Sequence, residues 1–418
     1  MKCKKFLLAF VSVLLVLTTT AGLFGCAVRV SAEDLMEGFV GKGPGVTEIP
    51  GEGASGVTDF AVRLLQQCVA EGKNTLLSPL SVLAALSMTA NGAENGTKTE
   101  MEDVLGSDVD GLNAFFCAYT NSLAGEGKSG LSLANSIWFK SENGFEVKKD
   151  FLQKNADFYG AAAYKAPFDD STLSDINGWV NKNTDGMIPK ILDEIPKDAV
   201  MYLINALSFD AEWETIYKMK NQIREGTFTL EDGKEQTAEF MCSKESRYLD
   251  DGKATGFIKY YSGRRFAFAA LLPNEGVTVG EYVASLDGET LGKMIRSPLE
   301  ESVEVLLPKF ETEYDAELSK TLTEMGMTSA FDPSGADFTG IGTLRGANLY
   351  ISRVIHKTFI SVGEKGTRAG AATAVEMAKN SSAPMERTVF LNRPFVYMLI
   401  DTEAGIPLFI GTMMNVAG

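Results

Sequence analysis

One short segment near the C-terminal end limits what this chain can fold into more than any other feature. Residues 364–374 have the sequence Glu-Lys-Gly-Thr-Arg-Ala-Gly-Ala-Ala-Thr-Ala, and a strongly apolar run over residues 389–414 follows soon after. An exposed connector has no need for so many small side chains. A segment that must slide between two existing strands does need them, because a large side chain would clash on entry. The composition therefore favours a segment that can enter a sheet.

The first residues predict an export signal. Lys2, Lys4 and Lys5 precede an apolar run over residues 6–17, and small residues then lead to Cys26. Basic, apolar and small-residue regions in this order are typical of a signal peptide. The apolar run is shorter than the about 20 residues that a membrane-spanning helix needs.

Two processing sites compete in this region. Residues 23–26, Leu-Phe-Gly-Cys, resemble the box at which bacterial lipoproteins are cut and their cysteine is lipidated, which would make Cys26 the lipidation site. The alternative is simple secretion, with cleavage after Ala32. We predict a signal peptide over residues 1–25, a flexible tether rich in Gly, Pro and acidic residues over 26–55, and one domain over 56–418. The expected location is extracellular, secreted or lipid-anchored to the outer face of a bacterial membrane.

Composition excludes some classes of protein. The chain has 418 residues, 45% of them hydrophobic, which is enough for a large core. Its formal net charge is −16, and loss of residues 1–25, with three lysines and no acids, makes it −19. So acidic a chain is a poor candidate for nucleic acid binding. Within the predicted domain the cysteines are Cys68, Cys117 and Cys242, an odd, widely spaced set that does not make a disulfide framework.

Hydrophobic periodicity predicts an α+β fold. An amphipathic helix is expected from about Phe60 to a stop at Gly72, and an apolar helix from Leu80 to Met88 after Ser78-Pro79. Strand patterns occupy residues 131–139, 202–209, 266–272 and 303–307. Helical patterns dominate the first half and strand patterns the second, with no clear internal boundary, which favours one domain with large sheets.

The sequence offers no persuasive catalytic site. His356 is the single histidine, so HExxH and multi-histidine metal sites are impossible, and GxSxG and Walker motifs are missing. His356 lies on an apolar strand pattern over residues 349–357, where a lone histidine is usually a hydrogen-bonded core residue. We expect no metal, no cofactor and no enzymatic activity.

An ordered set of motifs over residues 57–415 resembles the serpin family. The motifs are residues 74–81 (Asn-Thr-Leu-Leu-Ser-Pro-Leu-Ser), Gly92, Gly96 and Thr97, residues 134–138, residues 176–180 with Thr184, Gly186 and Ile188, Asn205 eight residues before Trp213, residues 272–276, residues 307–310, residues 389–397 (Val-Phe-Leu-Asn-Arg-Pro-Phe-Val-Tyr), Phe409 and Gly411. Any one of these could arise by chance, whereas the ordered set does not.

The resemblance implies a serpin fold. We expect a large mixed central β-sheet, further sheets, about eight or nine helices and an exposed reactive-centre loop. In serpins an Asn and a His bridge the two central strands above serines of a buried helix. Asn205, His356, Ser78 and Ser81 fit those positions and are called the shutter cluster below. Buried polar groups are costly unless paired, so the cluster would act as a latch.

The resemblance also implies a mechanism. The target protease forms an acyl-enzyme on the loop, and the cut loop inserts into the central sheet as a new strand before deacylation. Gly366 lets the hinge bend, Thr367 enters first, and Arg368 faces solvent by strand parity. The implied hinge residues are Glu364, Gly366, Thr367, Ala369, Gly370, Ala371, Ala372 and Thr373.

Counting from Glu364 places the reactive bond after the seventeenth residue, between Asn380 and Ser381. Lys379 would suit a trypsin-like protease, and Ala378 or Met377 an elastase-like one, so these positions stay open. The expected partner of this inhibitor is therefore a trypsin-like or elastase-like serine protease, with a cysteine protease as a further option.

Three other functions compete with inhibition: a non-inhibitory serpin that carries or binds another molecule, a hydrolase, and a lipid-anchored surface receptor. The single histidine and the missing nucleophile elbow disfavour the hydrolase. The small residues of the hinge disfavour a non-inhibitory serpin, although Arg368 departs from the pattern. We expect a monomer whose only link to a membrane is the lipid anchor.

Overall fold

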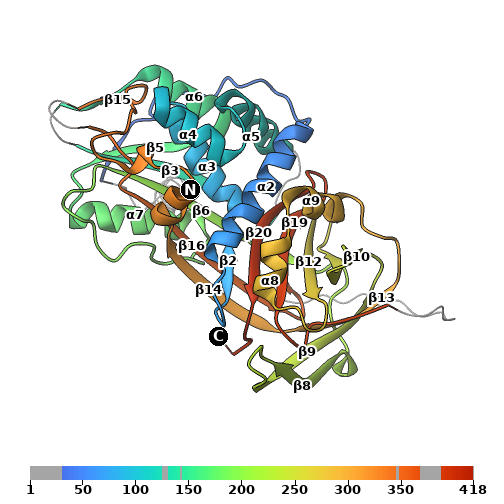
Figure 1. Ribbon diagram of the computed structural model, residues 1–418. Coiled ribbons are helices and arrows are strands. Elements are labelled where there is room, and N and C mark those ends of the chain that lie inside the picture. The colour runs from blue at the N-terminus through green and yellow to red at the C-terminus, as the bar shows by residue number, and fades with distance from the viewer. Residues whose placement is uncertain (1–30, 125–129, 142–143, 345–347, 368–386, 418) are drawn as a thin grey trace, which may run out of the picture.

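The computed structural model describes residues 31–124, 130–141, 144–344, 348–367 and 387–417. The blue to teal helices of residues 51–159 gather at the top of Figure 1, and strands lie among and below them. The nine α-helices described are α2 (Gly51–Cys68), α3 (Pro79–Ala90), α4 (Asn95–Leu105), α5 (Val109–Ala124), α6 (Lys149–Tyr159), α7 (Asp170–Asn183), α8 (Val279–Ser285), α9 (Gly288–Arg296) and α10 (Ser319–Glu324). Short 3-10 turns occupy Lys220–Gln222 and Ser329–Phe331.

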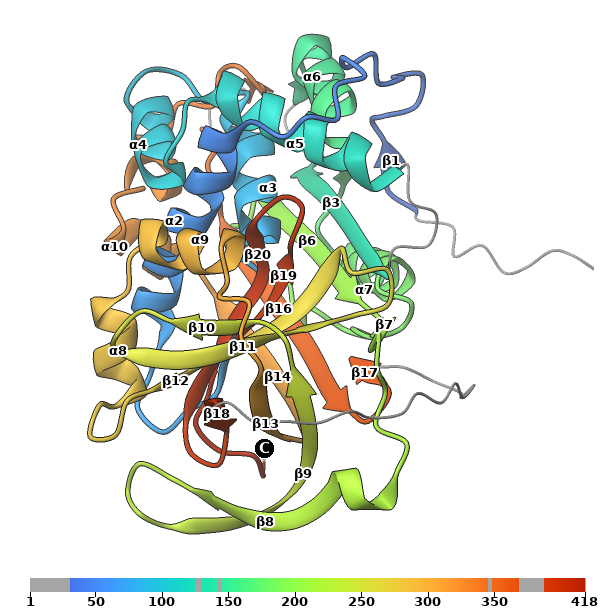
Figure 2. The same cartoon turned by 90° about the vertical axis from the view of Figure 1, so that its right-hand side faces the viewer.

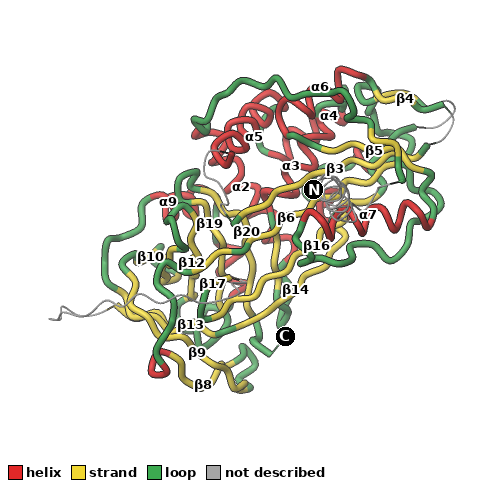
Figure 3. Tube along the Cα trace, turned by 180° about the vertical axis from the view of Figure 1, so that it is seen from behind, coloured by secondary structure: helices red, strands yellow, loops and turns green. Residues whose placement is uncertain are grey.

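The central sheet has eight strands and mixes parallel with antiparallel pairs. Its strands are, in spatial order, β1 (Glu33–Asp34), β5 (Ala162–Ala166), β3 (Leu131–Lys140), β6 (Met201–Phe209), β16 (Arg353–Gly363), β17 (Gly366–Thr367) and β7 (Ala211–Glu212), with β14 (Phe310–Glu317) paired to β16. Seen from behind, β5, β3, β6, β16 and β14 follow one another across the sheet, and α7 packs against β3 and β6 (Figure 3).

Three further sheets complete the fold. One has six strands: β10 (Tyr248–Asp250), β11 (Ala254–Tyr260), β12 (Phe266–Pro273), β19 (Phe395–Asp401), β20 (Ile406–Met413) and β2 (Thr75–Leu77). One has four strands: β18 (Arg387–Phe390), β13 (Val303–Pro308), β9 (Glu235–Glu245) and β8 (Ile223–Thr229). The last pairs β15 (Gly342–Thr343) with β4 (Glu146–Val147).

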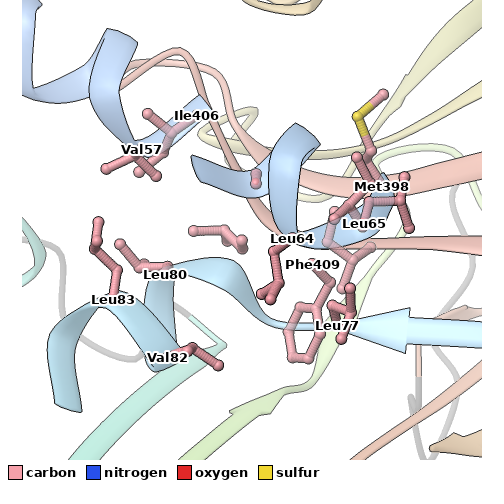
Figure 4. Close-up of a cluster of buried hydrophobic side chains, with 14 of the residues drawn as sticks. Val57, Leu64, Leu65, Leu77, Leu80, Val82, Leu83, Met398, Ile406 and Phe409 are labelled. Carbon is pink, nitrogen blue, oxygen red and sulfur yellow. The ribbon is translucent and has the colours of Figure 1, made fainter. Parts of the chain in front are cut away.

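Helix α3 forms the centre of the core. Pro79 occupies its first turn, where a missing N–H costs nothing, and all its residues from Pro79 to Ala90 are buried. A helix that is apolar on every side must be covered on every side. It contacts β6 of the central sheet and β20 of the six-stranded sheet. Leu80, Val82 and Leu83 pack against α2, β2 and β20 in the cluster of Figure 4.

The secondary structure agrees with the sequence patterns in type and differs at the ends. Both predicted helices form, as α2 and α3, although α2 begins at Gly51, earlier than expected. The four predicted strands form as β3, β6, β12 and β13. The α+β class, the large mixed sheet and the number of helices are confirmed. Cys68, Cys117 and Cys242 are free thiols.

The tether predicted over residues 26–55 is wrong for residues 31–55. Residues 33–34 form strand β1 against β5, and helix α2 begins at Gly51. The glycines in between allow close packing: a Cβ on Gly43 would lie 2.1 Å from the carbonyl oxygen of Asp157, and one on Gly41 would lie 2.6 Å from that of Ala156. Composition misled because close approach and flexibility both favour glycine.

The predicted signal peptide and Cys26 lie outside the described residues. Among the residues described, no helix is both long enough and apolar enough to span a membrane.

Candidate functional site

The candidate site lies between the two central strands, β6 and β16. Each has one edge occupied: β6 pairs with β3 over its whole length, and β16 pairs with β14. On their facing edges, β6 and β16 pair directly with each other at one end only. There they run in parallel, with Arg353–Ile355 opposite Tyr202–Ile204. At the other end β17 lies between β16 and β7 (Figure 2). In the described register, no direct pairing joins residues 205–209 to residues 356–361.

Strand β17 is the first part of the predicted hinge. Chain reversal after β16 places Gly363 opposite Gly366 and Val362 opposite Thr367, while Thr367 also pairs with Ala211 of β7. Both residues of β17 are buried. The first residues of the predicted hinge are therefore buried in the sheet, because β17 pairs with a strand on each side.

Gly366 is required at its position. Its φ is +156°, and a Cβ would lie 2.1 Å from the carbonyl oxygen of Ala211. Any side chain would have to push β17 and β7 apart, so only glycine allows this close approach.

Thr367 makes a specific buried contact. Its side chain is 2% exposed, and its hydroxyl oxygen lies 2.5 Å from the phenol oxygen of Tyr261. Burial raises the pKa of Tyr261, so the phenol stays protonated and can share a hydrogen bond with the threonine hydroxyl. Tyr261 in turn stacks on Trp213, with ring centroids 4.4 Å apart. The side chain of Thr367 therefore contacts one ring of a stacked aromatic pair, Tyr261 and Trp213.

Trp213 holds the turn before β17. Its backbone N–H donates to the carbonyl of Lys365 at 2.8 Å, and its indole Nε1 donates to the carbonyl of Gly363 at 2.8 Å. The N–H of Tyr217 donates to the carbonyl of Glu364 at 3.0 Å. These three bonds satisfy the carbonyl groups of the turn and fix where the hinge begins.

An ion pair closes the outer side of the turn. The Nζ of Lys309 lies 2.5 Å from Oε1 of Glu364 and 3.1 Å from Oε2 of Glu239. The hydrogen bond from Lys309 lowers the pKa of Glu364. Because these side chains are partly exposed, solvent screens the pair and it contributes little by itself.

The shutter cluster lies where the pairing of β6 with β16 ends. His356 follows Ile355 directly and is 2% exposed. Its Nε2 accepts a hydrogen bond from the backbone N–H of Ser78, at 3.1 Å, at the start of α3. The hydroxyl of Ser78 donates to the carbonyl of Leu408 in β20. Ser78 therefore joins the central sheet to the six-stranded sheet.

Burial lowers the pKa of His356 to about 4. The ring is neutral at pH 7, and Nε2 must stay unprotonated to accept the bond from Ser78. His356 is thus the hydrogen-bonded core residue expected from its strand pattern, and nothing about it suits general-base catalysis.

The two other predicted shutter residues are Ser81 in α3 and Asn205 in β6. Ser81 is buried, and its hydroxyl donates to the carbonyl of Ser78 within α3 rather than to the histidine. Asn205 occupies β6 opposite Asn135 and directly follows Ile204, as His356 follows Ile355. The side chain of Asn205 lies outside the described part of the chain.

The rest of the predicted loop also lies outside the described residues. This applies to the hinge residues Ala369, Gly370, Ala371, Ala372 and Thr373, and to the reactive-bond candidates Met377, Ala378, Lys379, Asn380 and Ser381. Sequence reasoning missed Tyr261, Tyr217 and Lys309. Tyr261 lies between β11 and β12, Tyr217 in the segment after β7, and Lys309 between β13 and β14. The only available signal was their position near recognised motifs, such as Lys309 within residues 307–310.

Comparisons with known proteins agree with this architecture. The family model for the serpins, described as serine protease inhibitors, matches residues 55–416. An uncharacterized serpin-like protein of Thermococcus kodakarensis is 31% identical over 370 residues, covering 86% of this chain and 84% of that protein. Human neuroserpin is 27% identical and covers 86% of this chain and 90% of its own.

Solved structures give the same result. The native state of tengpin, a thermophilic serpin, is 44% identical, covers 92% of this chain and 99% of its own, and has a TM-score of 0.87. The latent state of tengpin, at 45% identity and covering 89% of this chain and all of its own, has a lower TM-score of 0.78. A complex of thyroxine-binding globulin with thyroxine, 24% identical over 87% of this chain and 99% of its own, shares the fold with a TM-score of 0.74. The chain belongs to the serpin family, a family of protease inhibitors rather than enzymes, and has the serpin fold.

Proposed function

We propose that the protein is an inhibitory serpin that traps a serine protease as a covalent acyl complex. One observation carries the proposal: strand β17 already lies between β16 and β7, at the head of the interval where β6 and β16 do not pair. A cut loop that continues from Thr367 can extend this strand toward His356. Each added residue can form ladder hydrogen bonds to strands on both sides.

The protease is caught because insertion competes with deacylation. The protease serine attacks the loop carbonyl, the peptide bond breaks, and the new N-terminus leaves with the C-terminal part of the loop. The N-terminal part, still esterified to the protease, is drawn along the sheet. For this step the shutter bond between Ser78 and His356 lies at the far end of the interval, where the inserting strand would reach it.

The reactive bond is proposed at Asn380–Ser381, with Lys379, Ala378 and Met377 as alternatives. Few trypsin-like or elastase-like proteases favour Asn at the cut, whereas Lys379 would suit a trypsin-like protease and Ala378 or Met377 an elastase-like one. The basic and apolar N-terminal sequence supports export, and we propose that the inhibitor works outside the cell, as a monomer, either secreted or anchored through Cys26.

A protease panel tests the proposal. The inhibitory protein should form a band on a denaturing gel with the combined mass of the protease and the cut inhibitor, and the mass of the released C-terminal fragment should identify the reactive bond. Thr367→Arg should abolish that band while the loop is still cut, because an unpaired charge cannot enter the buried site beside Tyr261.

Thr388→Arg is the matched control. Thr388 is exposed in β18, on the other side of the loop, and stays out of the inserting segment. It should keep the covalent band. A stable complex with Thr367→Arg would refute insertion, and cleavage without any complex in the unchanged protein would favour a non-inhibitory serpin.

A further inference from the structure

A buried carboxylate binds the beginning of the described chain. Asp175 of α7 is 8% exposed. Its Oδ2 accepts hydrogen bonds from the backbone N–H of Ser31 at 2.9 Å, the hydroxyl of Ser31 at 2.7 Å and the backbone N–H of Ala32 at 3.1 Å. We call Ser31, Ala32 and Asp175 the N-terminal clasp. A buried carboxylate needs such donors, because an unpaired buried charge is strongly unfavourable.

The clasp leads directly into the sheet. Ala32 packs against the core cluster that contains Trp138 and Trp179. Strand β1 follows, with Glu33 opposite Lys165, and the N–H of Leu35 donates to the carbonyl of Ala163 at 2.9 Å. The residues next to the candidate cleavage point after Ala32 are therefore part of the fold on both sides of that bond.

On the premise of the proposed export, we propose that the leader is removed by hydrolysis of a peptide bond before Ser31, at Gly25–Cys26, and that the mature protein keeps the clasp. Hydrolysis adds one water to the bond, leaving a carboxylate on the leader and an ammonium group on the mature chain. Cleavage after Ala32 would remove all three donors of Asp175 together with the leader. Cleavage at Gly25–Cys26 keeps them, and leaves Cys26 as the first residue, five positions before the clasp.

The intact mass of the exported protein tests this directly. The full chain is produced in a bacterium with its own N-terminal sequence and recovered from envelope and medium. A mature chain that begins at Cys26, with or without the added mass of a lipid, is expected. A chain that begins at Glu33 overturns the inference while leaving export intact. A chain that retains Met1 contradicts export, on which the inference depends. The denaturing-gel assay with proteases tests inhibition separately, so the two proposals can fail independently.

Substitutions in the full chain provide a second measurement. Ser31→Ala and Asp175→Asn should each lower the thermal midpoint of the exported protein by a few degrees, because each weakens the clasp. Thr47→Ala removes an exposed hydroxyl from the same segment and should leave the midpoint unchanged. If Ser31→Ala matches the unchanged protein, Ser31 is absent from the mature chain or makes no contact there, and the inference fails.

Discussion

Tyr261 and Thr367 illustrate how single residues govern this site. The phenol is fully buried, and the hydroxyl of Thr367 is the partner that its hydrogen bond reaches in the described structure. When Thr367 leaves this position, the phenol loses the hydrogen-bond partner that it has in the seated hinge. An unsatisfied buried group of this kind costs about 1–3 kcal/mol. The pair therefore favours the seated hinge.

A double-mutant cycle measures this contribution. Thr367→Val should lower the thermal midpoint because it leaves the phenol of Tyr261 unpaired. Tyr261→Phe removes both the donor and the need for a partner, so the double variant should be more stable than the sum of the single effects predicts, by on the order of 1 kcal/mol. Strictly additive effects would show that the two hydroxyl groups do not interact.

His356 predicts a pH dependence of stability. Its pKa is about 4 in the folded protein against an ordinary value of 6.5. The unfolded chain therefore binds the proton first as pH falls, and stability is lost between about pH 6.5 and pH 4. At about 1.4 kcal/mol per pKa unit, the full loss is about 3.5 kcal/mol.

The measurement is the unfolding midpoint in denaturant across that pH range. Because His356 is the single histidine, His356→Gln should flatten the curve between pH 6.5 and 5, although it lowers stability at pH 7. If the midpoint of the variant changes with pH as steeply as that of the unchanged protein, the pH dependence comes from carboxylates rather than from His356.

Strand β17 is the element on which the site depends. Two residues make a strand here because they pair with β16 on one side and β7 on the other, and because Trp213, Tyr217 and Lys309 hold the turn before them. The motif positions Gly366 and Thr367 could be predicted from the sequence. Their burial could not, because it results from neighbours more than a hundred residues away, Ala211 and Tyr261.

Gly366→Ala should release this element. The new Cβ would collide with the carbonyl oxygen of Ala211, so β17 should separate from β7 and the hinge should be cut faster by a non-target protease. Gly363→Ala is the matched control: Gly363 lies directly opposite Gly366, and a Cβ there meets no atom within 4 Å. Equal cleavage rates in the two variants would mean that the close approach to β7 does not hold the hinge.

At the scale of the whole molecule, the central sheet contains an interval in which its two central strands do not pair directly. The pairing of β6 with β16 stops at Ile355, and the pairing of β16 with β17 begins at Val362. A strand inserted beside residues 356–361 would add roughly one hydrogen bond per residue on each side, at about 0.5–1.5 kcal/mol each. Under the proposed function, the cut protein should therefore have a more stable arrangement available to it.

Loop cleavage should consequently raise the thermal midpoint. Protein cut once within residues 375–386 by a non-target protease is expected to unfold at a markedly higher temperature than the intact chain. The hydrogen bonds counted above correspond to roughly 6–18 kcal/mol before the cost of ordering the loop is subtracted. Cut Thr367→Arg should show no such rise, because its hinge cannot enter. A cut chain that unfolds at or below the intact midpoint would contradict insertion.

The sequence alone determined the fold and the family, because the motifs that carry both are local: Pro79 starting a buried helix, apolar strand runs, and residues 389–397 before the last hairpin. It also predicts which residues form the hinge and the shutter, and these assignments stay predictions. Only the tertiary structure decided that Gly366 and Thr367 are buried, that His356 binds the backbone of Ser78, and that residues 31–50 belong to the domain. These outcomes depend on contacts across long sequence distances, and neither composition nor periodicity records the partner that a glycine or a buried polar group will meet.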